Sequence, residues 1–340
     1  MPSLVLLCPT SSSSLLGVGQ VALEWAAALR RSGVPVRLEE AWRGVRTPSA
    51  LRARVARLHA DCHRGEVLEC PAPWAAALPR GGVPVVHRST QPDLAYLAAE
   101  GAGAPLRHRL QLGATALQVV SGWSRVDGFL CLGSAERAWM ESHAPWLGPR
   151  LHTYLHAPPA GLRPQLQEVA RRRSAAPAGK TRWLWMGRWT AHKGTGALVQ
   201  FLEERLARYP GESATLAGTG LRPELPPSLR GRVTVLPRYE REALPGLLAS
   251  HDAGLFTSVA EGWGLSLQEM LEAGLPVYAT HVGAAVDLAP YFPRSLRPFP
   301  PPGSAARIEP GGPPREDYDE RFSWDVIASD AAVWLRTLSG

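Results

Sequence analysis

The most informative stretch of the chain has two glutamates on either side of a glycine-rich turn. Glu261 and Glu269 lie within residues 257–277, where the turn leads into an apolar run of helical period. A helix that starts after such a turn presents unpaired N–H groups and the positive end of its dipole, which suit a phosphate. Ionised carboxylates only accept hydrogen bonds and therefore suit sugar hydroxyls. Together these features predict a nucleotide-sugar site.

Glu269 also has a purely structural interpretation. The segment 266–269 (Ser-Leu-Gln-Glu) fits a capping box, in which Glu269 would bond back to the amide at the start of the helix. That interpretation does not account for Glu261, or for the glycines at positions 262 and 264.

A second motif, at residues 187–194 (Gly-Arg-Trp-Thr-Ala-His-Lys-Gly), carries two cations. It follows the apolar run 183–186, which predicts a buried strand, and it precedes a helix expected over 195–208. An arginine fork suits paired phosphate oxygens, whereas a lysine acts as a mobile point charge. Fixed cations would stabilise the negative charge that builds on a departing diphosphate. Only two of the 37 basic residues are lysines, Lys180 and Lys193, so general composition does not explain a lysine here.

Both segments resemble motifs of retaining glycosyltransferases of the GT-B fold, specifically family 4. They match its E-x7-E and G-R-x4-K-G elements. By this resemblance Glu261 contacts the donor sugar, Glu269 holds the ribose, and Arg188 and Lys193 clamp the diphosphate. The resemblance also implies a metal-independent reaction, with no cofactor besides the nucleotide-sugar donor. Donor contacts are further expected at Gly187, Gly262, Trp263, Gly264 and Leu265.

A glycine pair near the N-terminus is a further candidate. Residues 17–22 fit G-x-G-x-x-A, which is the outline of a dinucleotide site. However, residues 9–16 separate this motif from the first expected strand, whereas a dinucleotide turn should follow that strand at once. The family has a similar loop near the donor phosphates. We therefore interpret Gly17 and Gly19 as backbone that approaches the donor closely.

Three more side chains are candidates because of their positions. His87 closes an apolar strand where family 4 enzymes often place a histidine against the donor sugar, although a structural role is equally open. Tyr239 falls where the base-binding loop is expected and could stack on the nucleobase, or simply pack on the surface. Trp263 replaces the phenylalanine usual in the family and could contact the sugar. The acidic stretch 317–319 (Asp-Tyr-Asp) is interpreted as solvated charge, and no metal site is expected.

Length and composition limit the class of protein. A chain of 340 residues suits two domains, and 45% hydrophobic with 20% charged residues is typical of a soluble globular protein. No apolar run is long enough to span a membrane, although peripheral membrane contact stays open. The four cysteines form no C-x-x-C pair, which favours reduced thiols and a cytoplasmic location.

The positive charge is concentrated in the first half. Residues 1–155 hold 16 arginines against 11 acidic residues. This excess could favour an anionic acceptor such as a phosphorylated sugar, an acidic lipid surface or nucleic acid. A solvated face of an arginine-rich protein is the alternative.

Short strands and helices alternate in both halves, which argues for parallel sheets covered on both faces. By the resemblance, these form an α/β protein of the GT-B fold, with two Rossmann-like domains facing a central cleft. A stretch rich in Pro and Gly, roughly residues 290–316, is expected to be a loop. We expect an acceptor-side domain over 1–157, a linker over 158–181, a donor domain over 182–322, and a C-terminal helix over 323–340 that crosses back to the first domain.

The sequence therefore predicts a retaining glycosyltransferase that moves a sugar from a nucleoside-diphosphate sugar, foremost a UDP-sugar, to a hydroxyl acceptor. Two alternatives stay open. One is action on a modified nucleic-acid base, which rests only on the charge of the first half. The other is a non-catalytic GT-B subunit that binds a sugar nucleotide, against which the complete motif set argues.

Overall fold

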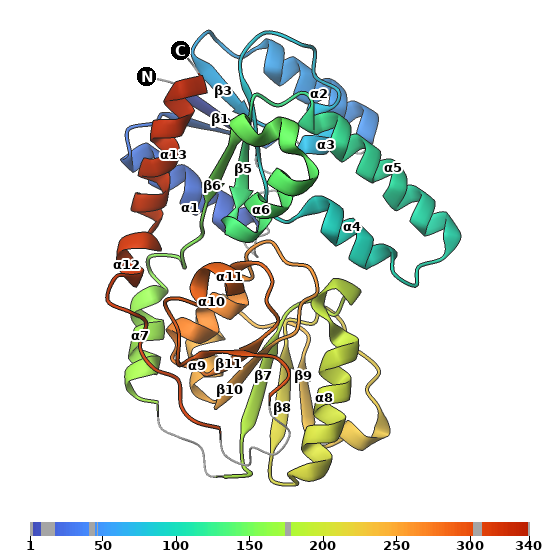
Figure 1. Cartoon of the computed structure of the whole chain (residues 1–340), viewed down its shortest axis with the longest axis vertical. Coiled ribbons are helices and arrows are strands. Elements are labelled where there is room, and N and C mark those ends of the chain that lie inside the picture. The colour runs from blue at the N-terminus through green and yellow to red at the C-terminus, as the bar shows by residue number, and fades with distance from the viewer. Residues whose placement is uncertain are drawn as a thin grey trace. The chain divides into compact units, whose positions relative to one another are not determined.

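A computed structural model of the chain consists of two compact units. Unit 1 comprises Met1–Ala157 with Asp319–Gly340, and unit 2 comprises Pro158–Tyr318 (Figure 1). Each unit contains one sheet of six strands, all paired in parallel. The structure describes residues 3–7, 18–40, 45, 47–173, 178–301 and 308–338.

The sheet of unit 1 has the strand order β2-β1-β3-β4-β5-β6. Every residue of its strand β5 is buried, because a parallel sheet is covered by helices on both faces. The strands are β1 (Ser3–Leu7), β2 (Val36–Glu39), β3 (Glu66–Glu69), β4 (Val85–Arg88), β5 (Gly128–Leu132) and β6 (Leu151–Tyr154). The helices are α1 (Val18–Arg31), α2 (Pro48–Ala60), α3 (Ala72–Ala75), α4 (Asp93–Gly101), α5 (Leu106–Trp123) and α6 (Gly133–His143).

The C-terminal helix α13 (Trp324–Leu338) belongs to unit 1, where it packs against α1 and β6. Its buried stripe includes Leu335, which is 1% exposed. On β6, the ring of His152 stacks on Trp334 with 5.1 Å between centroids. Arg31 of α1 forms an ion pair of 2.7 Å with Asp325. The chain enters this tail at Asp319, slightly before the boundary that we expected, through the single turn α12 (Tyr318–Arg321).

Unit 2 has the strand order β12-β11-β10-β7-β8-β9. Its core includes a buried ion pair, since Arg205 and Glu212 are both about 2% exposed or less and their side chains lie 2.6 Å apart. The strands are β7 (Arg182–Met186), β8 (Ser213–Ala217), β9 (Val233–Leu236), β10 (Ala253–Phe256), β11 (Val277–Ala279) and β12 (Leu296–Pro298). The helices are α7 (Arg163–Arg171), α8 (Thr195–Arg208), α9 (Leu244–Ala249), α10 (Leu265–Glu272) and α11 (Ala284–Leu288).

The expected linker contains a helix, and the stretch that we expected to be a loop contains a strand. The expected linker 158–181 includes α7, which packs against α9 and α10 in unit 2. Arg163 of α7 forms an ion pair with Glu272 of α10 at 3.0 Å. The local composition in Pro, Ala and Gly does not indicate a partner so far away in the sequence. The expected loop 290–316 includes the edge strand β12, which pairs with β11. The expectation of a loop throughout residues 290–316 is corrected accordingly.

The described part of the chain has no helix with both the length and the apolar character needed to cross a bilayer. Among the cysteines in the described ranges, Cys70 and Cys131 are buried and Cys62 is half-buried, and all three are free thiols.

Candidate functional site

Unit 2 brings the two sequence motifs together at one edge of its sheet. Gly187 directly follows β7, and the turn with Glu261 follows β10. These strands are hydrogen-bonded neighbours. Because the carboxyl ends of parallel strands meet at the same edge of a sheet, the loops that follow them lie side by side.

The side chains of the two motifs are in direct contact. The ammonium of Lys193 forms an ion pair with Glu261 Oε2, and both side chains are mostly buried. Ser258 Oγ donates a second hydrogen bond to the same oxygen, at 3.1 Å. The backbones are joined as well, because the N–H of Val259 donates to the carbonyl of His192 at 2.8 Å. These contacts therefore hold the ammonium of Lys193 and the carboxylate of Glu261 next to each other.

Only glycine can occupy the turn between Lys193 and α8. Gly194 has φ +66°, and a Cβ there would lie 1.9 Å from the carbonyl oxygen of Thr257. Thr257 in turn donates from its hydroxyl to the carbonyl of Lys193 at 2.7 Å, and it accepts from the Trp185 indole at 3.1 Å. This close approach holds the lysine loop against the glutamate loop.

Helix α10 begins at a second required glycine. Gly264 has φ +87°, and a Cβ there would lie 2.7 Å from the ring of Phe256. No side chain caps the helix, and its first backbone bond runs from the N–H of Leu267 to the carbonyl of Gly264 at 2.9 Å. The N–H groups of Leu265 and the residue after it precede that bond, so they are available to an anion. The capping-box interpretation of Glu269 is therefore wrong.

Glu269 is 3% exposed and pairs with a residue that the sequence did not indicate. Its Oε1 lies 2.6 Å from Nη2 of Arg241, on the short helix Arg241–Ala243 after β9. Burial raises the pKa of Glu269 and the neighbouring Glu272 adds to this, while Arg241 opposes them. No motif marks Arg241, whose only signal is its position in the expected base-binding loop.

Tyr239 lies over the carboxyl ends of β7 and β8. A Cβ on Gly218 would come within 3.2 Å of its ring, and its hydroxyl is 4.0 Å from the sulfur of Met186. Burial raises the pKa of Tyr239 to about 12, and the charge of Glu269 adds to the shift. Tyr239 and Glu269 therefore share one environment, as expected if a base and its ribose bind there.

Arg188 is the exposed cation of the site. Its side chain makes no hydrogen bond or ion pair with any residue in the described ranges, and only its carbonyl is engaged, by the N–H of Thr190 at 3.0 Å. Its guanidinium is therefore available to a ligand.

The side chain of Trp263 faces the interior of unit 2. It is 2% exposed, and its indole donates to Gln268 Oε1 at 2.7 Å. Gln268 donates onward to the hydroxyl of Tyr318, which donates to Glu272. This buried indole therefore has a partner within unit 2, and a contact between Trp263 and the donor sugar stays a prediction. Gly262, which precedes Trp263 in the glycine turn, is buried as well.

The candidates in unit 1 that the structure describes, Gly19 and His87, are both buried. Gly17 lies outside the described residues, and Gly19 is buried in the first turn of α1. His87 Nδ1 accepts from the N–H of Ala72 at 2.9 Å, so the neutral ring carries its proton on Nε2, which lies 3.9 Å from Asp93. Burial lowers the pKa of His87 to about 4. Nδ1 thus has a structural partner, whereas Nε2 is buried without a hydrogen-bond partner among the described residues.

A polar cluster that the sequence analysis missed lies at the carboxyl ends of β3, β4 and β6. Arg88 Nε donates to Glu69 Oε1 at 2.7 Å, and the Trp25 indole donates to the other oxygen at 3.1 Å. Tyr154 donates from its hydroxyl to the carbonyl of Ser89. Charged residues at the ends of apolar strands were the available signal, because such ends carry functional groups in parallel sheets.

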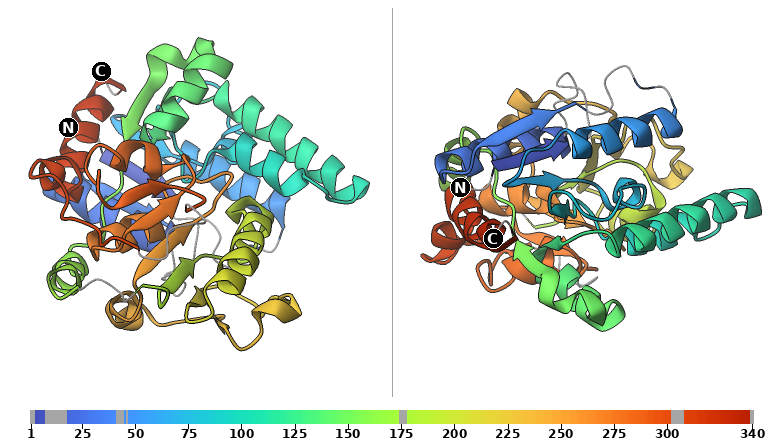
Figure 2. Two further views of the ribbon diagram at one scale, coloured as in Figure 1. Left: turned by 60° about the horizontal axis from the view of Figure 1, so that its bottom comes forward. Right: turned by 90° about the horizontal axis from the view of Figure 1, so that it is seen from above.

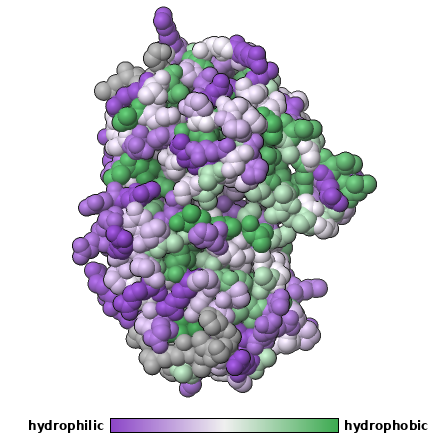
Figure 3. Space-filling model, in the orientation of Figure 1, coloured by the Kyte–Doolittle hydropathy of each residue, from purple (hydrophilic) through white to green (hydrophobic). Residues whose placement is uncertain are grey.

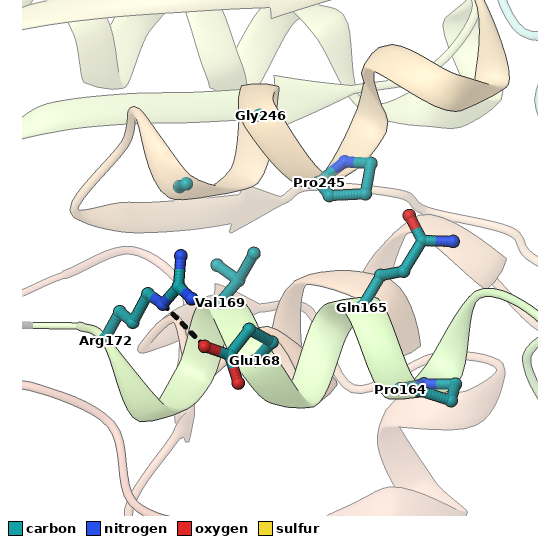
Figure 4. A pocket seen from close by; sticks show the side chains of 8 residues that line it. Pro164, Gln165, Glu168, Val169, Arg172, Pro245 and Gly246 are labelled. Atoms are coloured by element: carbon teal, nitrogen blue, oxygen red, sulfur yellow. Dashed lines mark ion pairs between the residues drawn. The ribbon is translucent and has the colours of Figure 1, made fainter.

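A shallow groove in unit 2 is separate from these residues. It has a volume of about 480 Å³ and lies between α7 and α9, where Glu168 pairs with Arg172 (Figure 4). None of the donor candidates lines it. Within the described ranges, no group of His, Cys, Asp and Glu side chains is arranged to hold a metal ion.

Comparison with known proteins agrees with this architecture. Residues 180–290 match the family described as "Glycosyl transferases group 1". A search of curated proteins found no match to this sequence. Among solved structures, WaaG, a glycosyltransferase involved in lipopolysaccharide biosynthesis, is 15% identical with a TM-score of 0.58, and the alignment covers 100% of this chain and 97% of that one.

Two further structures are similar over almost their whole length. Alr3699/HepE of Anabaena, solved with UDP and glucose, is 14% identical with a TM-score of 0.55, and the coverage is 99% of this chain and 97% of that one. Sucrose-phosphate synthase of Thermosynechococcus elongatus is 17% identical with a TM-score of 0.57, and the coverage is 100% and 95%. At such identities the likeness concerns the fold. The chain thus has the α/β GT-B fold, and its residues 180–290 are similar to the group 1 glycosyltransferases.

Proposed function

We propose that this chain is a retaining, metal-independent glycosyltransferase that takes its sugar from a nucleoside-diphosphate sugar, foremost a UDP-sugar. The observation that carries the proposal is the ion pair between Lys193 and Glu261 beside the exposed Arg188, all at the carboxyl edge of the sheet in unit 2. That a structural relative was solved with UDP and glucose supports UDP as the first nucleotide to test.

The two cations would act on the leaving group. Lys193 and Arg188 can both reach a diphosphate at this edge, and the N–H groups at the start of α10 add donors for the same anion. As the glycosidic bond breaks, negative charge builds on the diphosphate, and pre-placed donors stabilise it without having to reorganise.

The two carboxylates would bind the remainder of the donor. Glu261, held by Lys193 and Ser258, presents its other oxygen to a sugar hydroxyl. Glu269 would accept from the ribose hydroxyls, with Tyr239 against the base. Neither carboxylate is assigned as a nucleophile. We propose attack on the same face of the sugar, with the leaving phosphate oxygen taking the proton of the acceptor hydroxyl.

Protection by nucleotides tests the donor site. Purified protein is heated with UDP-, GDP-, ADP- and TDP-sugars, and the thermal shift and released diphosphate are recorded. The chain contains only one other lysine, the exposed Lys180, so Lys180→Ala is the matched control for Lys193→Ala. We expect one nucleotide to stabilise the wild type and the control but not Lys193→Ala. An equal response in both variants would rule out the lysine clamp.

The stereochemistry of the product tests the mechanism separately. NMR of the anomeric proton in the transferred sugar distinguishes the two outcomes. An α-linked product from an α-linked donor is expected, and a β-linked product would exclude the retaining mechanism.

A further inference from the structure

Helix α5 is pressed against unit 1 along one face only. Val119 and Trp123 are 1% and 4% exposed, and a Cβ on Gly122 would lie 1.7 Å from the carbonyl oxygen of Ala72. This contact with α3 fixes the C-terminal half of α5. The N-terminal half extends away from the sheet of unit 1, together with α4 (Figure 2).

The opposite face of α5 is also apolar. Leu106, Leu110, Leu117 and Val120 are 71%, 67%, 75% and 38% exposed. At about 100° per residue they fall within a sector of roughly 80°, opposite the buried face, and they span about 21 Å of helix. We call these four residues the outer stripe. A surface helix of a globular protein normally carries polar residues on the side away from its core.

Exposed apolar side chains are concentrated in the outer stripe and are not spread evenly over the surface. The described residues include ten large hydrophobic side chains that are exposed, and four of them lie in this one helix. In Figure 3 the part of the molecule formed by α4 and α5 is coloured mainly hydrophobic, with hydrophilic atoms at its tip. A contiguous apolar surface of this kind marks an interaction site.

The charged residues of α5 itself are both positive, and the acidic residues Glu100 and Asp127 lie beyond its ends. Residues 101–126 contain Arg107, Arg109 and Arg125 but no acidic residue. On a helical projection Arg107 and Arg109 fall on either side of the stripe. Both are exposed, and neither side chain makes a hydrogen bond or ion pair with any residue that the structure describes.

We propose that the outer stripe of α5 binds the surface of an anionic membrane. Apolar side chains flanked by arginines, on a helix that carries no acidic residue, form the pattern of a helix that lies in the interface of a bilayer. The leucines would enter the boundary of the acyl chains, while the arginines bind lipid phosphates. A second copy of this chain fits less well, because a symmetric contact would bring the same arginines together with no carboxylate to pair with them.

Vesicle binding tests this proposal without any measurement of activity. The full chain is sedimented with vesicles of phosphatidylcholine alone and of phosphatidylcholine mixed with phosphatidylglycerol. We expect binding to the mixed vesicles that weakens as salt rises, and binding to the neutral vesicles that is about tenfold weaker or more. The double variant Leu110→Ser/Leu117→Ser should bind the mixed vesicles at least about tenfold more weakly. Arg107→Gln/Arg109→Gln should lose about tenfold on the mixed vesicles only.

Matched substitutions at other exposed positions serve as controls. Leu221→Ser/Val333→Ser removes apolar side chains that are 53% and 60% exposed, and Arg230→Gln/Arg321→Gln removes the same charge. Both should bind vesicles as the wild type does, and circular dichroism checks the fold of every variant. Equal binding by the stripe variants and their controls would overturn the proposal. So would a wild-type dimer that the stripe variants convert to a monomer with no vesicle binding, because the stripe would then be a contact between copies. Neither result depends on whether the chain transfers sugars.

Discussion

Each carboxylate of the glutamate motif pairs with a cation in the protein itself. Lys193 pairs with Glu261, and Arg241 pairs with the buried Glu269. A nucleotide sugar that binds here has to share these cations with the carboxylates or replace them. Before the ligand binds, the cations therefore hold the two carboxylates in place. Arg241 is therefore as relevant to the donor site as the residues that the motifs indicate.

Loss of Arg241 should lower stability and weaken nucleotide binding together. Arg241→Gln leaves the carboxylate of Glu269 buried without its ion pair. Since the arginine is about one-third exposed, we expect a loss of roughly 1–2 kcal/mol of unfolding free energy, less than for a fully buried pair. Urea denaturation measures it. Arg238→Gln, an exposed arginine of the same loop, is the control, and adding Glu269→Gln to Arg241→Gln should recover part of the loss. Equal unfolding curves for both arginine variants would contradict the pairing.

Glu136 of α6 should make stability depend on pH. Burial raises the pKa of Glu136 to about 7, against hydrogen bonds donated by Ser89 Oγ and the N–H of Leu132, each 2.6 Å long. Between its usual pKa and this value the folded state holds the proton more tightly than the unfolded state, so stability falls as pH rises through that window.

The measurement compares the wild type with Glu136→Gln in urea between about pH 5 and pH 8. The stability of the wild type relative to the variant should fall by up to roughly 3 kcal/mol as the pH rises. Glu141→Gln, on the exposed side of the same helix, should run parallel to the wild type. A constant difference between wild type and Glu136→Gln across this range would show that Glu136 titrates normally.

At the scale of elements, two glycine turns position the donor residues. Gly194 lets the loop after β7 touch the loop after β10, and Gly264 starts α10 against Phe256. Each has a positive φ, and each would place a Cβ inside a neighbouring group. The motifs thus depend on glycine for packing as well as for access to a ligand.

A pair of glycine substitutions separates these effects. Gly194→Ala should cost more than the 1–2 kcal/mol of its left-handed backbone, because the 1.9 Å approach to Thr257 forces the loop to move. It should also lose thermal protection by the nucleotide. Gly196→Ala, two residues later in α8 with open space around it, should be neutral or stabilising by about 0.5–1 kcal/mol. Differential scanning calorimetry with and without UDP measures the stability of both variants and their protection by the nucleotide. Protection retained in Gly194→Ala would show that this turn is not needed for nucleotide binding.

At the scale of the whole molecule, the chain closes unit 1 with its last helix. Strands β1 to β6 are complete by Tyr154, yet α13, more than 150 residues later, covers α1 and β6. Unit 1 therefore cannot be finished until the donor domain has been made. Its stability should depend on α13, whereas the donor site in unit 2 should not.

Leu335→Ala tests that division. Leu335 is 1% exposed in unit 1, so its truncation should cost about 2–5 kcal/mol, while Val333→Ala on the exposed side of α13 should cost little. Chemical denaturation measures the loss, and calorimetric titration with UDP should give the same affinity for both variants. A large drop in affinity for Leu335→Ala would mean that the tail also supports the donor site.

The sequence by itself determined the local features of this protein. Alternating apolar runs predicted the parallel sheets, and the motifs placed Lys193 and Glu261 in loops that follow strands, because each motif is a continuous stretch whose chemistry is visible in its own residues. Only the tertiary structure decided which distant residues meet. It paired Glu269 with Arg241, turned the indole of Trp263 inward and packed α7 on unit 2. These contacts join residues that are far apart in the sequence, so local patterns do not encode them. Tertiary packing likewise decides which apolar face of α5 stays exposed.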